Sequence, residues 1–417
     1  MKRPSTSRRR LPSLRWLGLA LFAAFATGGC ATTAVQPGVE ARQAVDPIPE
    51  TELLDVDIQI FDPGLPEGST GKLEDEGIFE DLRRSEARYI PVELMETLQA
   101  TGQWGAVRVV PEDSQGTDLV VSGTIVESTG QDLVVEVRAV DARGVVWLEK
   151  TYRQEADPWA YRDGEGVIDR EPFRSLYNQI ANDLVVARRP VTSADLLEIR
   201  RVAQLRFAAD IAPAAFGDHL ERNRKGHLVA ARLPADGDPM VARVDQVRER
   251  DALLVDTLTE HYANFHAQME EPYANWRRYS YEEELARAKV KKQAWARKIA
   301  GGLLLLGAIL SDPDTNSGAA ARDLAVIGGI ETIRSGISKG QEAKIHVEAL
   351  RELAASFDSE VTPLLVDVEG ETRELSGSAE AQYAAWRQML RDLFIEETGL
   401  AVDPDTGEPI LPSVAGQ

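Results

Sequence analysis

Residues 118–152 (DLVVSGTIVESTGQDLVVEVRAVDARGVVWLEKTY) decide the fold of the first half of this chain. They contain three valine-rich runs, at 118–125, 133–140 and 145–152, separated by short polar turns, the second of which is 141–144 (DARG). Apolar runs of this length are typical of strands, and turns this short join antiparallel neighbours. The stretch therefore predicts a three-stranded antiparallel meander.

The elements on either side complete an α/β region over residues 51–188. Residues 54–60 (LDVDIQI) alternate apolar side chains with acidic or amide ones, which is the period of a half-buried strand. A helix that ends at Gly102 and a strand at 107–110 come next. A second helix closes the region, so the expected order is β-α-β-β-β-β-α. The apolar positions of the two helices are Tyr89, Val92, Leu94 and Leu98 in the first and Phe173, Leu176, Ile180 and Leu184 in the second.

Part of this pattern resembles a known group of proteins. The residues that carry the resemblance are Tyr89, Leu94 and Leu98, then 102–104 (GQW), 107–111 (VRVVP) and 118–125 (DLVVSGTI). They are similar to a group of periplasmic lipoproteins that includes the curli-secretion lipoprotein, the outer-membrane activators of penicillin-binding proteins and the N-terminal domain of the Tol-system propeller protein. The resemblance implies a periplasmic binding or assembly domain rather than an enzyme. The long amphipathic hairpins of the pore-forming member are missing from the sequence, which argues against a channel.

After Pro190 the composition changes and predicts a helical region over residues 190–400. Ser193 is its expected first N-cap, and Glu271-Pro272 is expected to interrupt a long amphipathic helix. Because the chain is longer than one core usually holds, we expect two domains. The expected fold class is α+β, with an N-terminal α/β domain of mainly antiparallel sheet followed by a predominantly α-helical domain with long helices. The later segments expected are a Gly-rich helical hairpin (299–340), a small β-hairpin (363–376), a helix (379–397) and a disordered tail (401–417).

The first 29 residues have the features of a secretory signal peptide. Residues 1–15 carry six basic and no acidic side chains, 16–26 are apolar, and 27–29 (TGG) are small. The apolar run is too short to span a bilayer as a helix. Cys30 follows directly, and the arrangement resembles the lipobox of bacterial lipoproteins, although a threonine replaces the usual leucine three residues before the cysteine.

The lipobox resemblance implies an anchor and a destination. Cys30 would be acylated and become the new N-terminus, Ala31 indicates sorting to the outer membrane, and residues 30–50 are expected to form a lipidated tether with the protein on the periplasmic side. An ordinary cleaved signal with an incidental cysteine is the alternative. Residues 7–11 (SRRRL) faintly resemble a twin-arginine export signal, but the general secretion route is favoured.

The charge balance restricts the partners. The chain has 47 basic and 68 acidic residues, a net charge of −21, and without the six basic residues of the leader 41 basic residues remain, which gives −27. A surface this acidic argues against nucleic acid and against electrostatic adhesion to anionic lipid. Membrane contact is therefore expected through the lipid on Cys30, and the single cysteine leaves no internal disulfide.

The sequence contains none of the common catalytic or metal-binding motifs. His261 and His266 would point about 140° apart on a helix, so we expect two isolated surface histidines rather than metal ligands. We expect no enzymatic activity, no cofactor and no metal. Asp312, Asp314, Asn316 and Asp323 match positions of a calcium loop, but the glycine is displaced by one residue and a proline stiffens the loop, which favours a simple turn.

The segment 299–310 (IAGGLLLLGAIL) has two interpretations. It is favoured as one arm of a packed helical hairpin at the centre of the second domain, and small residues there would let helices of two copies approach and form a homo-oligomer. Alternatively it docks in a membrane or against partner helices. The basic stretch before it, from Arg287 to Lys298, supports this second interpretation.

Two aromatic clusters near prolines are candidate partner contacts: Trp159 with Tyr161, and Tyr273 with Trp276. They are also typical of residues that cover the edge of a core. Taken together, the sequence predicts a non-enzymatic outer-membrane lipoprotein that acts as a binding or assembly subunit of an envelope complex. An accessory or activator of peptidoglycan synthesis or of an envelope transporter is one alternative, and a cell-wall hydrolase with an unrecognised site is another.

Overall fold

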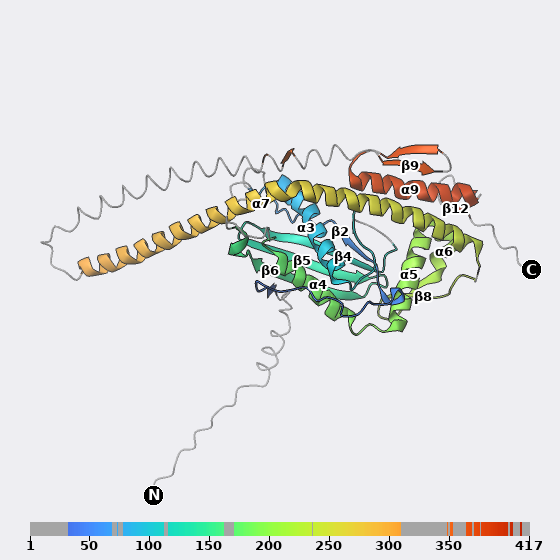
Figure 1. Cartoon of the computed structure of the whole chain (residues 1–417), viewed down its shortest axis with the longest axis horizontal. Coiled ribbons are helices and arrows are strands. Elements are labelled where there is room, and N and C mark those ends of the chain that lie inside the picture. The colour runs from blue at the N-terminus through green and yellow to red at the C-terminus, as the bar shows by residue number, and fades with distance from the viewer. Residues whose placement is uncertain are drawn as a thin grey trace, which may run out of the picture.

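A computed structural model describes residues 32–68, 73, 78–111, 116–161, 171–235, 237–309, 348, 351–352, 364–368, 371–375, 377–398, 401–402 and 409–410. The expected α+β class is confirmed: a mixed sheet occupies the N-terminal half and helices follow it (Figure 1). The elements of the first half are β1 (Thr32–Ala34), β2 (Val56–Gln59), α3 (Glu80–Thr101), β3 (Val107–Val110), β4 (Leu119–Ser128), β5 (Asp132–Asp141), β6 (Val146–Glu155) and α4 (Arg174–Arg188). Those of the second half are α5 (Ser193–Ile211), α6 (Pro213–Phe216), β7 (Leu220–Arg222), β8 (Leu228–Ala230), α7 (Pro239–Ile309), β9 (Leu364–Val368), β10 (Glu371–Leu375), α9 (Ala379–Thr398), β11 (Ala401–Val402) and β12 (Pro409–Ile410).

The six-stranded sheet has the order β1-β6-β5-β4-β2-β3. Strands β4, β5 and β6 pair antiparallel, which confirms the predicted meander. Strand β2 lies between β4 and β3 and is parallel to both. Helix α3 connects β2 with β3 and returns the chain to the end of the sheet at which β2 starts, so β3 runs in the same direction as β2. Gly102 ends α3 with a φ of 63°, a left-handed conformation that glycine adopts without strain.

One face of the sheet is covered by α3 and α4, and the other face, among the residues that the structure describes, carries exposed side chains. Side chains alternate along each strand, so Val121, Val135 and Tyr152 are buried beneath α3 and α4, while Glu136 and Arg138 are exposed on the opposite face. The outer edge at β3 is covered by α7, where the Thr259 hydroxyl donates to the backbone oxygen of Val109 at 3.1 Å. A covered edge cannot pair with a strand of another chain.

Helix α7 is continuous across Pro272, so the predicted interruption at Glu271-Pro272 is wrong. A proline inside a helix removes one backbone hydrogen bond and costs about 3 kcal/mol. Here Met269, Tyr273 and Trp276 on the flanking turns are buried against the rest of the molecule, and this packing holds the helix together over the proline. The C-terminal part of α7 runs on past the sheet (Figure 1).

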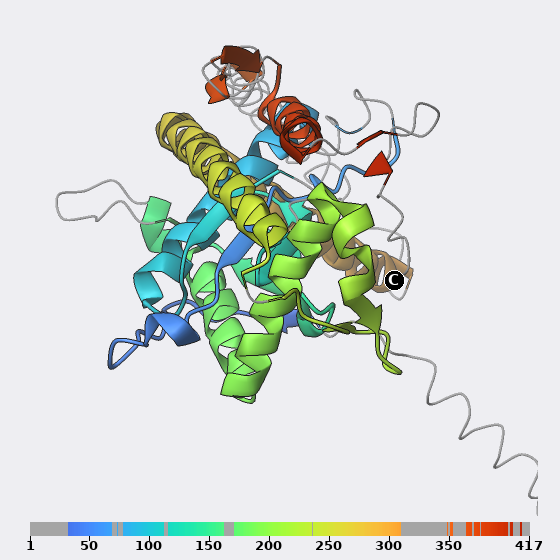
Figure 2. The same cartoon turned by 90° about the vertical axis from the view of Figure 1, so that its right-hand side faces the viewer.

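The helices after Pro190 share one hydrophobic core with the sheet, although the sequence suggested a domain boundary there. Helix α7 contacts α3 and β3, and α9 lies beside α7 (Figures 1 and 2). The N-cap of α5 is Thr192 rather than the predicted Ser193. The Thr192 hydroxyl accepts from the backbone N–H of Asp195 at 3.2 Å, and the Asp195 carboxylate accepts from the Thr192 N–H at 3.1 Å, forming a capping box.

The segment 32–50, expected to belong to a tether, is packed along the sheet and α4. Strand β1 pairs in parallel with β6, and Val35 is buried. Asn178 and Asn182 on α4 donate to the backbone oxygens of Val39 and Glu40, at 2.8 and 2.9 Å. The sequence pattern concealed this packing because most of the contacts are made by the backbone of the segment.

The C-terminal expectations have mixed outcomes. The small β-hairpin is confirmed as β9 paired with β10, and the final helix is confirmed as α9. The tail expected to be disordered contains the short antiparallel pair β11–β12. Of the Gly-rich hairpin, residues 299–309 are helical and form the end of α7, while 310–340 lie outside the described residues. Within the described part of the chain, no helix is both long and apolar enough to cross a membrane.

Replacing Gly130 by alanine should destabilise the contact between the β4–β5 turn and α7. A Cβ atom there would lie 2.1 Å from the backbone oxygen of Arg277 and 2.2 Å from the backbone nitrogen of Tyr281. Because two backbones would have to separate, we expect the free energy of unfolding in urea to fall by at least ~1–3 kcal/mol. Gly217→Ala is the matched control, since its Cβ would meet open space. Equal losses in the two variants would contradict the close approach.

Candidate functional site

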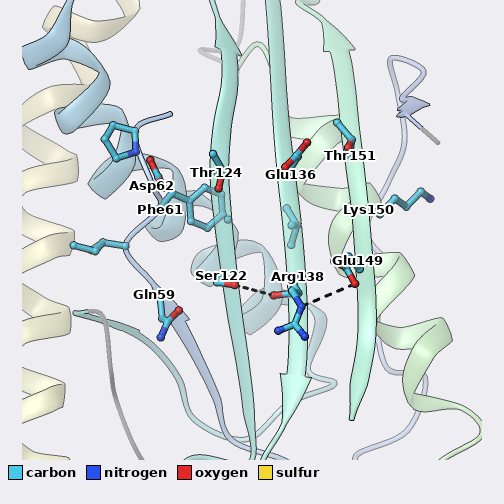
Figure 3. Close-up of a pocket in the computed structure, with 14 residues that line it drawn as sticks. Gln59, Phe61, Asp62, Ser122, Thr124, Glu136, Arg138, Glu149, Lys150 and Thr151 are labelled. Carbon is cyan, nitrogen blue, oxygen red and sulfur yellow. Dashed lines mark hydrogen bonds and ion pairs between the residues drawn. The ribbon is translucent and has the colours of Figure 1, made fainter. Parts of the chain in front are cut away.

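The face of the sheet opposite α3 and α4 carries a cavity of about 660 Å³ between the end of β2 and the strands of the meander (Figure 3). Its floor is formed by the outward side chains of β4, β5 and β6, and its wall by the loop that follows β2. The lining residues are Gln59, Ile60, Phe61, Asp62, Pro63, Ser122, Gly123, Thr124, Glu136, Val137, Arg138, Glu149, Lys150 and Thr151.

The wall stands where it does because Gly123 lets the loop come close. A Cβ atom at position 123 would lie only 2.4 Å from the ring of Phe61, so any residue larger than glycine would push the loop away. The backbone of Asp62 forms two hydrogen bonds with β4. The Asp62 N–H donates to the Gly123 oxygen at 2.8 Å, and the Asp62 oxygen accepts from the Ile125 N–H at 2.9 Å. These bonds fix the wall relative to the floor.

The floor is polar and its charges are partly balanced. Arg138 lies between Ser122, whose hydroxyl donates to the Arg138 backbone oxygen at 3.5 Å, and Glu149, whose carboxylate is 4.0 Å from Nε of Arg138. Lys150 points away from the floor (Figure 3), and its ammonium group donates to Asp183 on α4 at 2.7 Å. The polar groups that line the cavity include the hydroxyls of Ser122 and Thr124, the amide of Gln59 and the carboxylate of Glu136. Such a lining suits the binding of a polar ligand through hydrogen bonds.

A second cavity, of about 320 Å³, continues the first toward the β7–β8 hairpin. The two share Gln59, Ser122 and Arg138, and we call them together the sheet groove. The lining of the second cavity is rich in arginine and comes from four separate parts of the chain. Its residues are Gln59, Val120, Ser122, Arg138, Val140, Asp141, Ala142, Arg143, Gly144, Arg206, Arg222 and Leu228.

The aromatic candidates from the sequence do not line the groove. Trp159 is 65% exposed on the short turn Pro158–Tyr161. The Tyr161 hydroxyl donates to the Gly130 oxygen at 2.7 Å, and its ring lies 4.8 Å from that of Tyr281. Tyr273 and Trp276 are buried in the core, so their prediction as partner contacts is corrected: they belong to the face of α7 that packs on α3. Cys30 lies outside the described residues.

A buried polar cluster, between α3, α7 and the start of α4, was missed at the sequence level. Glu86, fully buried, accepts from the hydroxyls of Ser128 and Tyr273, both at 2.6 Å. Arg277 is 1% exposed, pairs with Glu171, and lies 3.9 Å from the centre of the Tyr273 ring. None of these side chains lines the sheet groove. They form a closed junction that sets the position of α7 on α3.

His266 belongs to the same cluster, so the expectation of two isolated surface histidines is wrong for this residue. It is buried, stacks on Tyr89 with ring centres 4.1 Å apart, and its Nε2 lies 3.0 Å from the Glu93 carboxylate. The spacing of four residues from Tyr262 and seven to Tyr273, both buried, would have indicated a position on the packed face of the helix.

Burial and the neighbouring charges shift the pKa values of the ionisable side chains in the cluster. Burial raises the pKa of the Glu171 carboxyl, and the neighbouring Arg277 guanidinium opposes this effect. Burial is the largest influence on Glu93 and acts against its ionisation, but the hydrogen bond with His266 and the positive charges of His266, Arg174 and Arg277 together outweigh it and lower the pKa of Glu93. Burial acts to lower the pKa of Arg277, but the interactions with Glu171 and with the hydroxyls of Tyr273, Tyr177 and Tyr89 together raise it above its ordinary value. The cluster therefore holds paired charges in the core.

Among the described residues, no group of three or more His, Cys, Asp or Glu side chains is arranged to hold a metal ion. The calcium-loop candidates Asp312, Asp314, Asn316 and Asp323 lie outside them. No model of a known protein family matches the chain, and a search of characterised proteins finds no similar sequence. The sheet groove is therefore the candidate site on geometry alone.

Proposed function

We propose that the protein is a non-enzymatic lipoprotein of the outer membrane, anchored through Cys30 on the periplasmic side, and a binding or assembly subunit of an envelope complex. The sheet groove carries this proposal. It offers hydroxyl, amide, carboxylate and guanidinium groups on a rigid meander, a surface suited to holding a polar partner. The leader of 29 residues, followed directly by Cys30, supports the anchor and the compartment.

Helix α7 supports the role in assembly. Its 71 residues correspond to a length of roughly 105 Å, and the arm, which we define as residues 282–309, runs beyond the sheet (Figure 1). The arm ends in the small and apolar residues of 299–309 (IAGGLLLLGAI), a composition that favours close contact between helices. We propose that the arm reaches a partner, or a second copy of the chain.

A role as an accessory or activator of an envelope enzyme or transporter is favoured by the exposed Trp159. Its turn lies at the base of the arm, because Tyr161 on the same turn contacts Tyr281, and Ser280 accepts from the Gly130 N–H at 3.0 Å. An exposed tryptophan beside an ordered arm suits a contact with a protein. In this role the protein should co-purify with its enzyme, and Trp159→Ala should weaken the interaction.

Site-specific photo-crosslinking in living cells tests the proposal. A photoreactive residue at Glu136, an exposed position in the groove, should join the protein to a defined partner in the outer-membrane fraction. The same probe at Val45, which is 96% exposed and outside the groove, is the control and should give no such product. Absence of a product at Glu136, or the same products from both positions, would contradict binding in the groove. Release of peptidoglycan fragments by the purified protein would contradict its non-enzymatic role.

A further inference from the structure

We propose that a cavity between α5, α6 and the first turns of α7 binds a zwitterionic ligand with an apolar body, whose anionic group pairs with Arg201 and whose ammonium group pairs with Asp245. An unblocked apolar peptide and a phosphatidylethanolamine lipid both have this chemistry, and direct titration separates the two sources. The cavity is distinct from the sheet groove, and its use depends neither on that groove nor on the lipid anchor.

This cavity has a volume of about 490 Å³ and lies at the end of the molecule away from the arm (Figure 1). Helices α5 and α6 form one wall, and the first turns of α7, which contact α5, form the other (Figure 2). Cavities of this size are typical of sites for small molecules. The space is therefore sufficient for a dipeptide or for the headgroup and part of the chains of a lipid.

The floor of the cavity is apolar. Leu205 and Ala208 of α5, Phe216 of α6 and Val244 of α7 are buried and line it from three helices. Leu233 also lines the cavity but is 55% exposed, so it stands at the opening. An apolar body that covers Leu233 and the floor removes this surface from water, which favours binding.

Two charges of opposite sign line the cavity from facing helices. Arg201 belongs to α5 and Asp245 to α7, and both side chains are exposed. Within the described part of the chain, neither forms an ion pair or a side-chain hydrogen bond, with the other or with a third residue. Asp238, the other carboxylate of the lining, already accepts from the Met240 N–H at 2.8 Å at the start of α7. One cation and one anion are therefore available to a ligand.

The two charges and the floor together select the class of ligand. The planar fork of the Arg201 guanidinium matches two oxygens of a carboxylate or phosphate, and the Asp245 carboxylate accepts hydrogen bonds from an ammonium group. A ligand with a single charge would leave one of these side chains without a partner and bring a like charge close to it. A zwitterionic head satisfies both side chains, while an apolar body covers the floor and Leu233.

Isothermal titration of the purified full-length protein with L-leucyl-L-leucine and, separately, with dihexanoyl phosphatidylethanolamine below its critical micelle concentration tests the inference. At low ionic strength we expect saturable binding of at least one of them, weakened about tenfold by Arg201→Gln and likewise by Asp245→Asn, because each change removes one partner of a charge-assisted hydrogen bond. Arg224→Gln and Asp46→Asn are the matched controls. Both residues are exposed and lie outside the cavity, and the changes alter the net charge equally, so binding should be unaffected.

Two further changes test the apolar and the ammonium contacts separately. Leu233→Ser should weaken binding several-fold, whereas Leu253→Ser, on α7 and 68% exposed but outside the cavity, should not. Acetylation of the amine in the ligand that binds removes its positive charge. The acetylated ligand should bind more weakly, and Asp245→Asn should reduce its binding no further; a further reduction would contradict the pairing of the ammonium group with Asp245.

The pattern of binding identifies the source of the ligand. Saturable binding of the dipeptide alone supports a peptide ligand, and binding of the lipid alone supports a phospholipid. Absence of saturable binding for both, or equal weakening by the lining variants and their controls, would overturn the site, whatever partner the crosslinking from Glu136 captures.

Discussion

Replacing Arg277 by alanine should lower the free energy of unfolding by about 3–5 kcal/mol, because it leaves the Glu171 carboxylate buried without its partner. Burial raises the pKa of Glu171 even beside Arg277, so without the guanidinium this carboxyl would have to be protonated or the junction would open to water. Urea unfolding followed by circular dichroism measures the loss.

An exposed ion pair is the control for this prediction. Arg84 pairs with Glu80 one helical turn away, with the arginine side chain 57% exposed, so Arg84→Ala should cost less than about 0.5 kcal/mol. The double variant Arg277→Met with Glu171→Leu removes both charges and should recover much of the stability lost in Arg277→Ala. If Arg277→Ala lost no more stability than Arg84→Ala, the buried junction would not be what holds α7 on α3.

The Cys30→Ala variant should move from the membrane fraction to the soluble fraction of the cell. The acyl chains on Cys30 are the proposed anchor, because this cysteine directly follows the leader and resembles the cysteine of a lipobox. Each buried methylene contributes about 0.8 kcal/mol, and several chains together make attachment lasting. Fractionation of cells that express the two proteins at equal levels, followed by a salt wash, measures the change.

The contrary outcome points to the arm. If residues 299–310 dock in a membrane, Cys30→Ala would still pellet with membranes and resist the salt wash. It would then come free only when Leu303 to Leu306 are made polar. Persistent attachment of the cysteine variant would therefore overturn the lipid as the sole anchor.

Local patterns predicted the elements of the sheet because their signals are short-range. The alternation in 54–60, the turn at 141–144 and the glycine at the end of α3 each act over a few residues, and all three are found in the structure. The course of α7 depends instead on distant contacts. Pro272 signals a break, and only the packing of Tyr273 and its neighbours on α3 overrides that signal.

The candidate site could not be predicted from the sequence, because it too depends on contacts between distant parts of the chain. The alternation of polar and apolar residues in the meander predicted which side chains face outward. It did not predict a groove, because the wall is formed by the loop with Phe61 and Asp62, which approaches β4 closely at Gly123. Arg138, Arg206 and Arg222 are separated by up to 84 positions in the chain and come together only through the hairpin. The sequence signal was instead aromatic residues near prolines: Trp159 is 65% exposed, whereas Tyr273 and Trp276 are buried.

Strand β1 begins at Thr32, and this has a consequence for how far the protein can stand from its membrane. A lipid on Cys30 would leave one residue, Ala31, between the lipidated cysteine and the strand that pairs Thr32 with Thr151, and the Cα atoms of Cys30 and Thr32 can be at most ~7 Å apart. The edge of the sheet at β1 would then be held next to the bilayer, and the groove would lie close to the lipid surface. A partner that binds in the groove would therefore have to approach close to the membrane surface.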